Sequence, residues 1–244
     1  MKKWCVSLEC GRIMSKLYLI PNVISDKSPC PLPPEQITLI SHLKLFFVEE
    51  PKSARRLLKQ INPSLVLSEC RLHDLNEHSK AQDIKEYIQM IGAEDAGIIS
   101  ESGCPCVADP GADLVLLAHQ KNIDVVPLVG PSSILLALMA SGLGGQNFAF
   151  NGYLPKLESD RIKKIKQLEQ RAIQEGQTQI LMEPPYRNQV IFNELIKTLN
   201  PHTRLCAALD IMGQEQSIKT KTILEWQKSN IALPKVPALF IINK

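Results

Sequence analysis

Two loops of small and rigid residues are the parts of this sequence best suited to hold a ligand. The first, residues 101–110, follows the apolar segment 96–100 and contains Gly103 but no bulky side chain. The second, residues 130–133, reads Gly-Pro-Ser-Ser and follows the apolar segment 124–129. Because glycine lets a ligand approach the backbone closely, both loops are predicted to line a binding site.

Each loop is predicted to connect a strand to a helix. Asp109-Pro110 is typical of a helix start, because Asp is a favoured N-cap and Pro fits the first turn, so we expect a helix from there to about Lys121. Residues 134–140 are predicted to form a second helix, which is apolar on all sides and therefore expected to be buried. In open parallel sheets ligands bind beyond the carboxyl ends of the strands, so both loops should open onto one crevice.

The rest of the chain also alternates between strand and helix, which predicts the α/β class. We expect two α/β domains, an N-terminal one at 17–129 with a mostly parallel sheet and a C-terminal one at 130–244 with a mixed sheet. The ligand cleft is expected between them, and residues 1–16 are expected to be an N-terminal extension. The other predicted strands are 17–21, 45–48, 148–151, 178–182, 204–209, 217–222 and 238–242, and the other predicted helices are 35–42, 52–60, 81–91, 159–171 and 186–199.

Composition is that of an ordinary globular protein. With 244 residues, 44% hydrophobic and 22% charged, the chain can form one large or two modest domains, and disordered, collagen-like and coiled-coil classes are excluded. The net charge of +3 does not by itself indicate a nucleic-acid partner. Two basic clusters are either solvated helix faces or a track for RNA phosphates: Lys52, Arg55, Arg56 and Lys59, and Lys156, Arg161, Lys163, Lys164 and Lys166.

The cysteines and the N-terminal residues indicate a compartment. Seven cysteines include no Cys-x-x-Cys pair, and no histidine has metal-ligand spacing, so we predict reduced thiols, no metal site and a cytoplasmic protein. Residues 1–14 are a poor secretory signal, and no segment reads as a transmembrane span, so no membrane partner is expected.

Several common catalytic signatures are missing from the sequence. It contains no G-x-G-x-x-G after a predicted strand, no G-x-x-x-x-G-K-[ST] and no G-x-S-x-G. Dinucleotide-dependent hydride transfer, phosphoryl transfer and the commonest type of serine hydrolase are therefore disfavoured.

The first loop carries a family resemblance. Residues 100–111, Ser-Glu-Ser-Gly-Cys-Pro-Cys-Val-Ala-Asp-Pro-Gly, resemble the S-D-A-G-T-P-x-x-S-D-P-G segment of the tetrapyrrole methylase superfamily, in its branch of ribosomal RNA small-subunit cytidine 2′-O-methyltransferases. Other segments resemble that branch in the same order along the chain: 49–58 its E-D-T-R…L-L, 130–143 its P-G-P-S…A-L-x-x-S-G-L, 150–161 its F-x-G-F-L-P…R and 183–187 its E-x-P-H-R.

The resemblance implies an S-adenosylmethionine-dependent methyltransferase with the cofactor between two domains. It also implies a homodimer and, as the substrate, ribosomal RNA or the small ribosomal subunit. Carried over residue by residue, it places cofactor contacts at Ile20, Gly103, Cys104, Val107, Ala108, Ser132, Ser133, Ile134, Met182 and Ala238.

The sequence departs from the family pattern at the predicted crevice. The expected T-P-I-G-N-L reads Pro-Asn-Val-Ile-Ser at residues 21–25, the first Asp of the loop is Glu101, and the Thr is Cys104. These changes keep the predicted cofactor class and leave the substrate open.

Methylation of a ribose hydroxyl needs a group that accepts the hydroxyl proton. Glu101 and Glu183 each follow a predicted strand and are the candidate catalytic residues, although Glu183 has an alternative partner in Arg187. Ser132 and Ser133 begin a predicted helix, where they either hold the cofactor carboxylate or cap the helix.

Two other functions remain open at this stage. One is methyl transfer to a tetrapyrrole or another small molecule, because the superfamily uses one type of cofactor site for several acceptors. The other is a non-catalytic S-adenosylmethionine-binding module, which the departures at Glu101 and Cys104 would allow.

Overall fold

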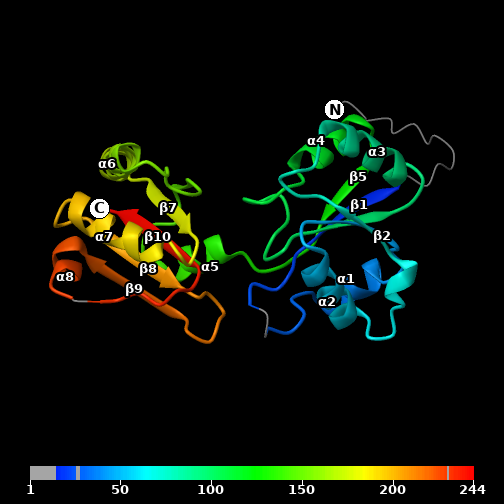
Figure 1. Ribbon diagram of the computed structural model, residues 1–244, viewed down its shortest axis with the longest axis horizontal. Coiled ribbons are helices and arrows are strands. Elements are labelled where there is room, and N and C mark those ends of the chain that lie inside the picture. The colour runs from blue at the N-terminus through cyan, green and yellow to red at the C-terminus, as the bar shows by residue number, and fades with distance from the viewer. Residues whose placement is uncertain (1–14, 26–27, 230) are drawn as a thin grey trace, which may run out of the picture. The chain divides into compact units, whose positions relative to one another are not determined.

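The computed structural model describes residues 15–25, 28–229 and 231–244 (Figure 1). The chain divides into two compact units, and the main division falls between Gly130 and Pro131. Of the expected N-terminal extension, residues 1–14 lie outside the described residues, whereas Lys16 already belongs to the first strand.

A five-stranded parallel sheet forms the first unit. The strand order is β3-β2-β4-β1-β5, and every neighbouring pair is parallel, as predicted. The sequence did not indicate β3, because this edge strand reads Arg-Leu-His-Asp and its side chains are half-buried or exposed. The strands are β1 (Lys16–Ile20), β2 (Leu45–Val48), β3 (Arg71–Asp74), β4 (Ala96–Ile99) and β5 (Asp124–Pro127).

Helices cover both faces of this sheet (Figure 1). α1 (Pro34–Ile40) and α2 (Pro51–Ile61) pack on one face against β1, β2 and β4. α3 (Ala81–Ile91) and α4 (Ala112–Gln120) pack on the other face. The connection after β1 therefore runs to one face and the connection after the neighbouring β4 to the opposite face, which makes their carboxyl ends a topological switch point.

A mixed sheet forms the second unit, as predicted. The strand order is β6-β7-β10-β8-β9; β6 and β7 are parallel, and the other pairs are antiparallel. The strands are β6 (Phe148–Phe150), β7 (Thr178–Glu183), β8 (Arg204–Leu209), β9 (Ser217–Thr222) and β10 (Ala238–Asn243).

The two faces of the second sheet are covered unequally. α6 (Glu158–Glu175), α7 (Asn188–Thr198) and α8 (Ile223–Gln227) pack on one face, and α5 (Ser133–Ser141) packs on the other. The prediction that α5 is buried on all sides is wrong. Ile134 and Ala137 face the sheet, but the side chains of Leu135 and Met139 are 50% and 78% exposed.

The predicted cap of α4 is also wrong. α4 begins at Ala112, its N-cap is Gly111, and no side chain caps it. Gly111 has φ +124°, a conformation that an L side chain rarely adopts, so the chain turns there instead of continuing a helix from Pro110. Asp109 is left in the loop before the helix. No helix in the described part of the chain is long and apolar enough to cross a membrane.

Candidate active site

The loops that leave β1 and β4 are tied together at the switch point. The backbone N–H of Asn22 donates to the carbonyl oxygen of Gly103 at 2.8 Å, and the N–H of Gly103 donates to the carbonyl oxygen of Asn22 at 3.2 Å. Ser100 Oγ donates to the same Gly103 carbonyl at 2.8 Å. Gly103 itself has φ +71°, which glycine adopts without strain.

Asn22 is a site residue that the sequence analysis missed. Its side chain is fully buried, and Nδ2 donates to the carbonyl oxygens of Ser100 and Glu101, both at 3.0 Å. Its Oδ1 accepts from the N–H of Val23 at 2.8 Å. The only sequence signal was its position, directly after the first strand and inside the segment that departs from the family pattern.

The loop between Cys104 and Gly111 contains backbone strain. Cys106 and Ala108 have φ values of +67° and +66°, a region costly for residues with a side chain. A Cβ on Gly111 would lie 2.8 Å from Cys106 Sγ, so this turn has no room for another residue type. Such strain persists only where the surrounding structure imposes it, and it is common at binding sites.

Three carboxylates gather at this end of the sheet. Glu49 follows β2, and its Oε2 accepts from the backbone N–H of Glu101 at 2.8 Å. Burial, together with the smaller effect of the negative charges of Glu49 and Glu101, raises the pKa of Asp109 from 3.8 to about 7. Burial also raises the pKa of Glu49, although the hydrogen bond from Glu101 opposes that shift.

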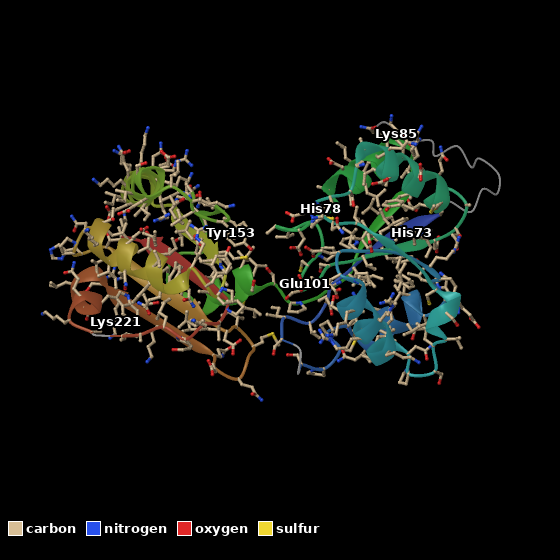
Figure 2. The ribbon with its side chains drawn as sticks, in the orientation of Figure 1. His73, His78, Lys85, Glu101, Tyr153 and Lys221 are labelled. Carbon is tan, nitrogen blue, oxygen red and sulfur yellow. The ribbon has the colours of Figure 1, made fainter. Side chains whose placement is uncertain are left out.

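A cavity of about 590 Å³ opens beside these carboxylates. His78 and Glu101 follow β3 and β4, so both lie at the carboxyl end of the sheet, and Figure 2 shows them on the same side of this unit. The cavity is lined by Glu49, Asn76, Glu77, His78, Ala108, Asp109 and Pro110.

Five of the predicted cofactor residues lie in the first unit. Ile20 ends β1 and is fully buried. Gly103 and Cys104 are in the strained loop, where Cys104 Sγ lies 3.9 Å from the Gly130 carbonyl oxygen and burial raises its thiol pKa. Val107 and Ala108 are exposed in the same loop.

The other five predicted cofactor residues lie in the second unit. Ser132 Oγ accepts from the N–H of Leu135 at 3.5 Å and so caps α5, as one of the two readings expected. The remaining four belong to α5 and to the adjacent strands β7 and β10, where Ile134 and Met182 share one apolar cluster: Ser133, Ile134, Met182 and Ala238.

Glu183 is paired with Arg187, the alternative that the sequence left open. Its Oε2 lies 3.4 Å from Arg187 Nε, and its Oε1 accepts from the N–H of Leu154 at 3.0 Å. Its side chain is fully buried, and burial raises its pKa against the opposing effect of Arg187. Arg187 also donates to the carbonyl oxygens of Leu154 and Pro155, so this pair fixes the loop that follows β6.

One member of the second basic cluster is not on the surface. Arg161 is 8% exposed and forms a buried ion pair with Glu194. It also donates to the carbonyl oxygens of Pro155 and Lys156. Both interpretations of this cluster, a solvated helix face and a track for RNA phosphates, are therefore wrong for Arg161.

Comparisons with known proteins show which proteins this chain is similar to. No family model matches. The ribosomal RNA small subunit methyltransferase I of Buchnera aphidicola subsp. Baizongia pistaciae is 28% identical, over 93% of this chain and 75% of that protein. The protein of the same name from Vibrio cholerae is 27% identical, over 86% of this chain and 69% of its own length.

The chain is similar over most of its length to proteins named ribosomal RNA small subunit methyltransferase I. The resemblance carried by its loops is thereby confirmed, as are its enzyme class, an S-adenosylmethionine-dependent methyltransferase, and its cofactor.

Solved structures show the same fold for this methyltransferase. A diphthine synthase matches with a TM-score of 0.63 at 13% identity, over 94% of this chain and 90% of that one. Uroporphyrin-III C-methyltransferase from Thermus thermophilus, complexed with S-adenosylhomocysteine, matches with a TM-score of 0.52 at 16% identity, over 94% and 97% of the two chains.

The residues at the switch point fit a sulfonium cofactor. S-adenosylmethionine carries a positive charge on sulfur, and the carboxylates of Glu49 and Glu101 make this end of the first sheet negative. The loop around Gly103 contains no bulky side chain that would keep a ligand from its backbone carbonyls.

Proposed function

We propose that this methyltransferase acts on ribosomal RNA of the small ribosomal subunit, with the ribose 2′-hydroxyl of a cytidine as the methyl acceptor. The observation that carries the proposal is the alignment of 93% of the chain with a relative that bears the name of a small-subunit ribosomal RNA methyltransferase. The topological switch point at Asn22 and Gly103 supports a ligand site there, because ligands bind at switch points of parallel sheets.

In this proposal Gly103 and its neighbours contact the cofactor at the carboxyl end of the first sheet. The predicted cofactor residues Ser132, Ser133 and Met182 of the second unit belong to the same proposal. When bound, S-adenosylmethionine supplies an electrophilic methyl group. The residues of the chain then position the acceptor for an in-line displacement, and positioning alone lowers a barrier by roughly 7–11 kcal/mol.

In this proposal Asp109 is the general base that accepts the proton of the acceptor hydroxyl. Glu101, which lies beside it, is the predicted alternative. A general base works best when its pKa is close to the operating pH, and that of Asp109 is about 7. The other predicted base, Glu183, is fully buried and engaged with Arg187 and the N–H of Leu154, which favours a role in holding its loop.

The test uses labelled S-adenosylmethionine and small ribosomal subunits from a strain that lacks the protein. We expect label in the ribosomal RNA, and digestion to nucleosides should yield 2′-O-methylcytidine. The Asp109→Asn variant should lose transfer. Asp124→Asn is the matched control. Asp124 is exposed at the amino end of β5, whereas Asp109 lies near the carboxyl ends of the strands. No label above background with the unaltered protein would reject the ribosomal RNA assignment.

A small-molecule acceptor is the second candidate. The observation that favours it is the acidic lining of the cavity beside Asp109, since Glu49 and Glu77 repel a phosphate backbone. The dependence of the methylation rate on salt concentration distinguishes the two candidate functions. Methylation of RNA should slow steeply as salt rises, whereas turnover of an uncharged small molecule should barely respond.

The predicted homodimer and cytoplasmic location belong to the same proposal. Exposed Leu135 and Met139 on α5 support an interface between copies of the chain, which sedimentation would detect as a doubled mass. The described cysteines, Cys30, Cys70, Cys104, Cys106 and Cys206, are all free thiols, in line with a reducing compartment.

A further inference from the structure

α2 presents a surface on which every charge is positive. The helix contains Lys52, Arg55, Arg56 and Lys59 and no acidic residue. These positions recur at intervals of three and four residues, so they share one face of the helix. The opposite face is buried in the core of the first unit through Ala54, Leu57, Leu58 and Ile61.

Hydrogen bonds fix both ends of the helix that carries this cationic face. Glu50 caps the first turn by accepting from the N–H of Ser53 at 2.8 Å. At the other end, Lys59 Nζ donates to the carbonyl oxygens of Pro63 and Leu65 at 3.1 and 2.8 Å. The helix backbone that carries these side chains is therefore fixed by its cap and its core contacts.

Two of the four cations are available to a partner. The side chains of Lys52 and Arg55 are exposed, and neither forms an ion pair within the described part of the chain. One helical turn is about 5.4 Å, so they lie within about one turn of each other along the helix. That arrangement suits two neighbouring phosphates of one nucleic-acid strand.

The position of α2 connects this face to the candidate active site. α2 begins at Pro51, two residues after Glu49, whose carboxylate accepts from the N–H of Glu101. A strand of RNA held along Lys52 and Arg55 thus lies at the same end of the sheet as the carboxylates.

The second basic cluster differs in kind. Lys163 and Lys166 on α6 are exposed, but that helix also carries four acidic residues, Glu158, Asp160, Glu169 and Glu175. Arg161 on the same helix forms an ion pair with Glu194. The surface of α6 is therefore close to neutral overall, which is typical of a solvated helix.

We propose that the exposed face of α2 binds the phosphates of a single-stranded RNA segment adjacent to the nucleotide being methylated. The inference rests on the proposed function, since it takes RNA as the substrate. It adds the docking surface and excludes α6 from that role. Phosphate contacts made by lysine and arginine release counterions, so binding must weaken as salt rises.

The experiment compares two variants with the same loss of charge. Lys52→Gln/Arg55→Gln removes two charges from α2, and Lys163→Gln/Lys166→Gln removes two from α6. A fluorescein-labelled oligouridine is titrated with each variant and with the unaltered protein between about 50 and 200 mM salt. For the α2 variant we expect binding weaker by on the order of tenfold and a salt slope reduced by roughly 1 to 1.5. The α6 variant should match the unaltered protein.

Two further measurements separate the possible failures. Binding of S-adenosylhomocysteine and the urea midpoint should be the same in both variants, which shows that each is folded. Equal RNA binding by the α2 variant and the unaltered protein, or a larger loss in the α6 variant, overturns the inference while subunit methylation still supports the proposed function. Normal RNA binding through α2 without methylation of any subunit rejects the proposed function and leaves the docking surface in place.

Discussion

Asn22 and Gly103 exchange two backbone hydrogen bonds, at 2.8 and 3.2 Å, across the ends of two neighbouring parallel strands. Because the chain leaves these two strands toward opposite faces of the sheet, nothing else in the regular hydrogen-bonding pattern would keep their loops together. The bridge therefore holds together the two loops against which we place the cofactor.

Replacement of Asn22 by Ala should weaken both folding and cofactor binding. The substitution leaves the carbonyls of Ser100 and Glu101 and the N–H of Val23 without their buried partner. An unsatisfied buried group costs about 1–3 kcal/mol, so urea denaturation should show a loss of that size. Calorimetry with S-adenosylhomocysteine should show weaker binding as well.

Asn188→Ala is the matched control for that variant. Asn188 is also buried and also donates to two carbonyl oxygens, those of Pro234 and Val236, at 2.7 and 2.9 Å. It should lose similar stability while retaining cofactor affinity. Equal losses of affinity in both variants would contradict a specific role for Asn22.

Methyl transfer should fall as the solution becomes more acidic than about pH 7. Only the ionised carboxylate of Asp109 accepts a proton, and its pKa is raised to about 7 by burial and by the charges of Glu49 and Glu101. Below that pH the rate should drop by about tenfold per pH unit. Asp109→Asn should lower the rate by roughly 10²–10⁴-fold and abolish this dependence. A preserved acidic limb in the variant would assign the titration to another group.

The same residue predicts how stability depends on pH. The folded pKa of Asp109, about 7, lies above its unfolded value near 3.8, so between these values the folded protein binds more protons than the unfolded chain. Stability must then decrease as pH rises through this window. Asp109→Asn should therefore raise the melting temperature well above pH 7, and the gain should disappear near pH 4. Asp124→Asn, which removes an exposed charge, controls for the change in net charge.

The layers of the fold could be predicted, because they follow from local alternation of apolar strands and amphipathic helices. The edge strand β3 could not, since the side chains of Arg71 and Asp74 are exposed and give no apolar pattern. The burial of α5 was overestimated for a related reason. Its composition is apolar throughout, but only one side meets the sheet, and Met139 remains 78% exposed.

The loops of the candidate site could be located from sequence, but not its carboxylates. Glu49 and Glu101 are 52 residues apart in sequence, and only the pairing of β2 with β4 brings them together. Asp109 looked like a helix cap because Asp-Pro is typical of one. The positive φ of Gly111 moves the helix start beyond it and leaves the carboxylate beside the cavity.

Gly130→Ala should destabilise the first unit and weaken cofactor binding. A Cβ at Gly130 would lie 2.1 Å from the Cβ of Pro21, and the proline ring, directly before Asn22, has little freedom to move. Overpacking of this kind costs about 1–3 kcal/mol, which urea denaturation would measure. Because the displaced Pro21 pulls on Asn22, affinity for S-adenosylhomocysteine should fall too. Gly145→Ala is the control, since its Cβ would meet only ordinary contacts at 3.7 Å from Leu138. Unchanged stability and affinity in Gly130→Ala would show that the chain near Pro21 adapts without disturbing the Asn22 bridge.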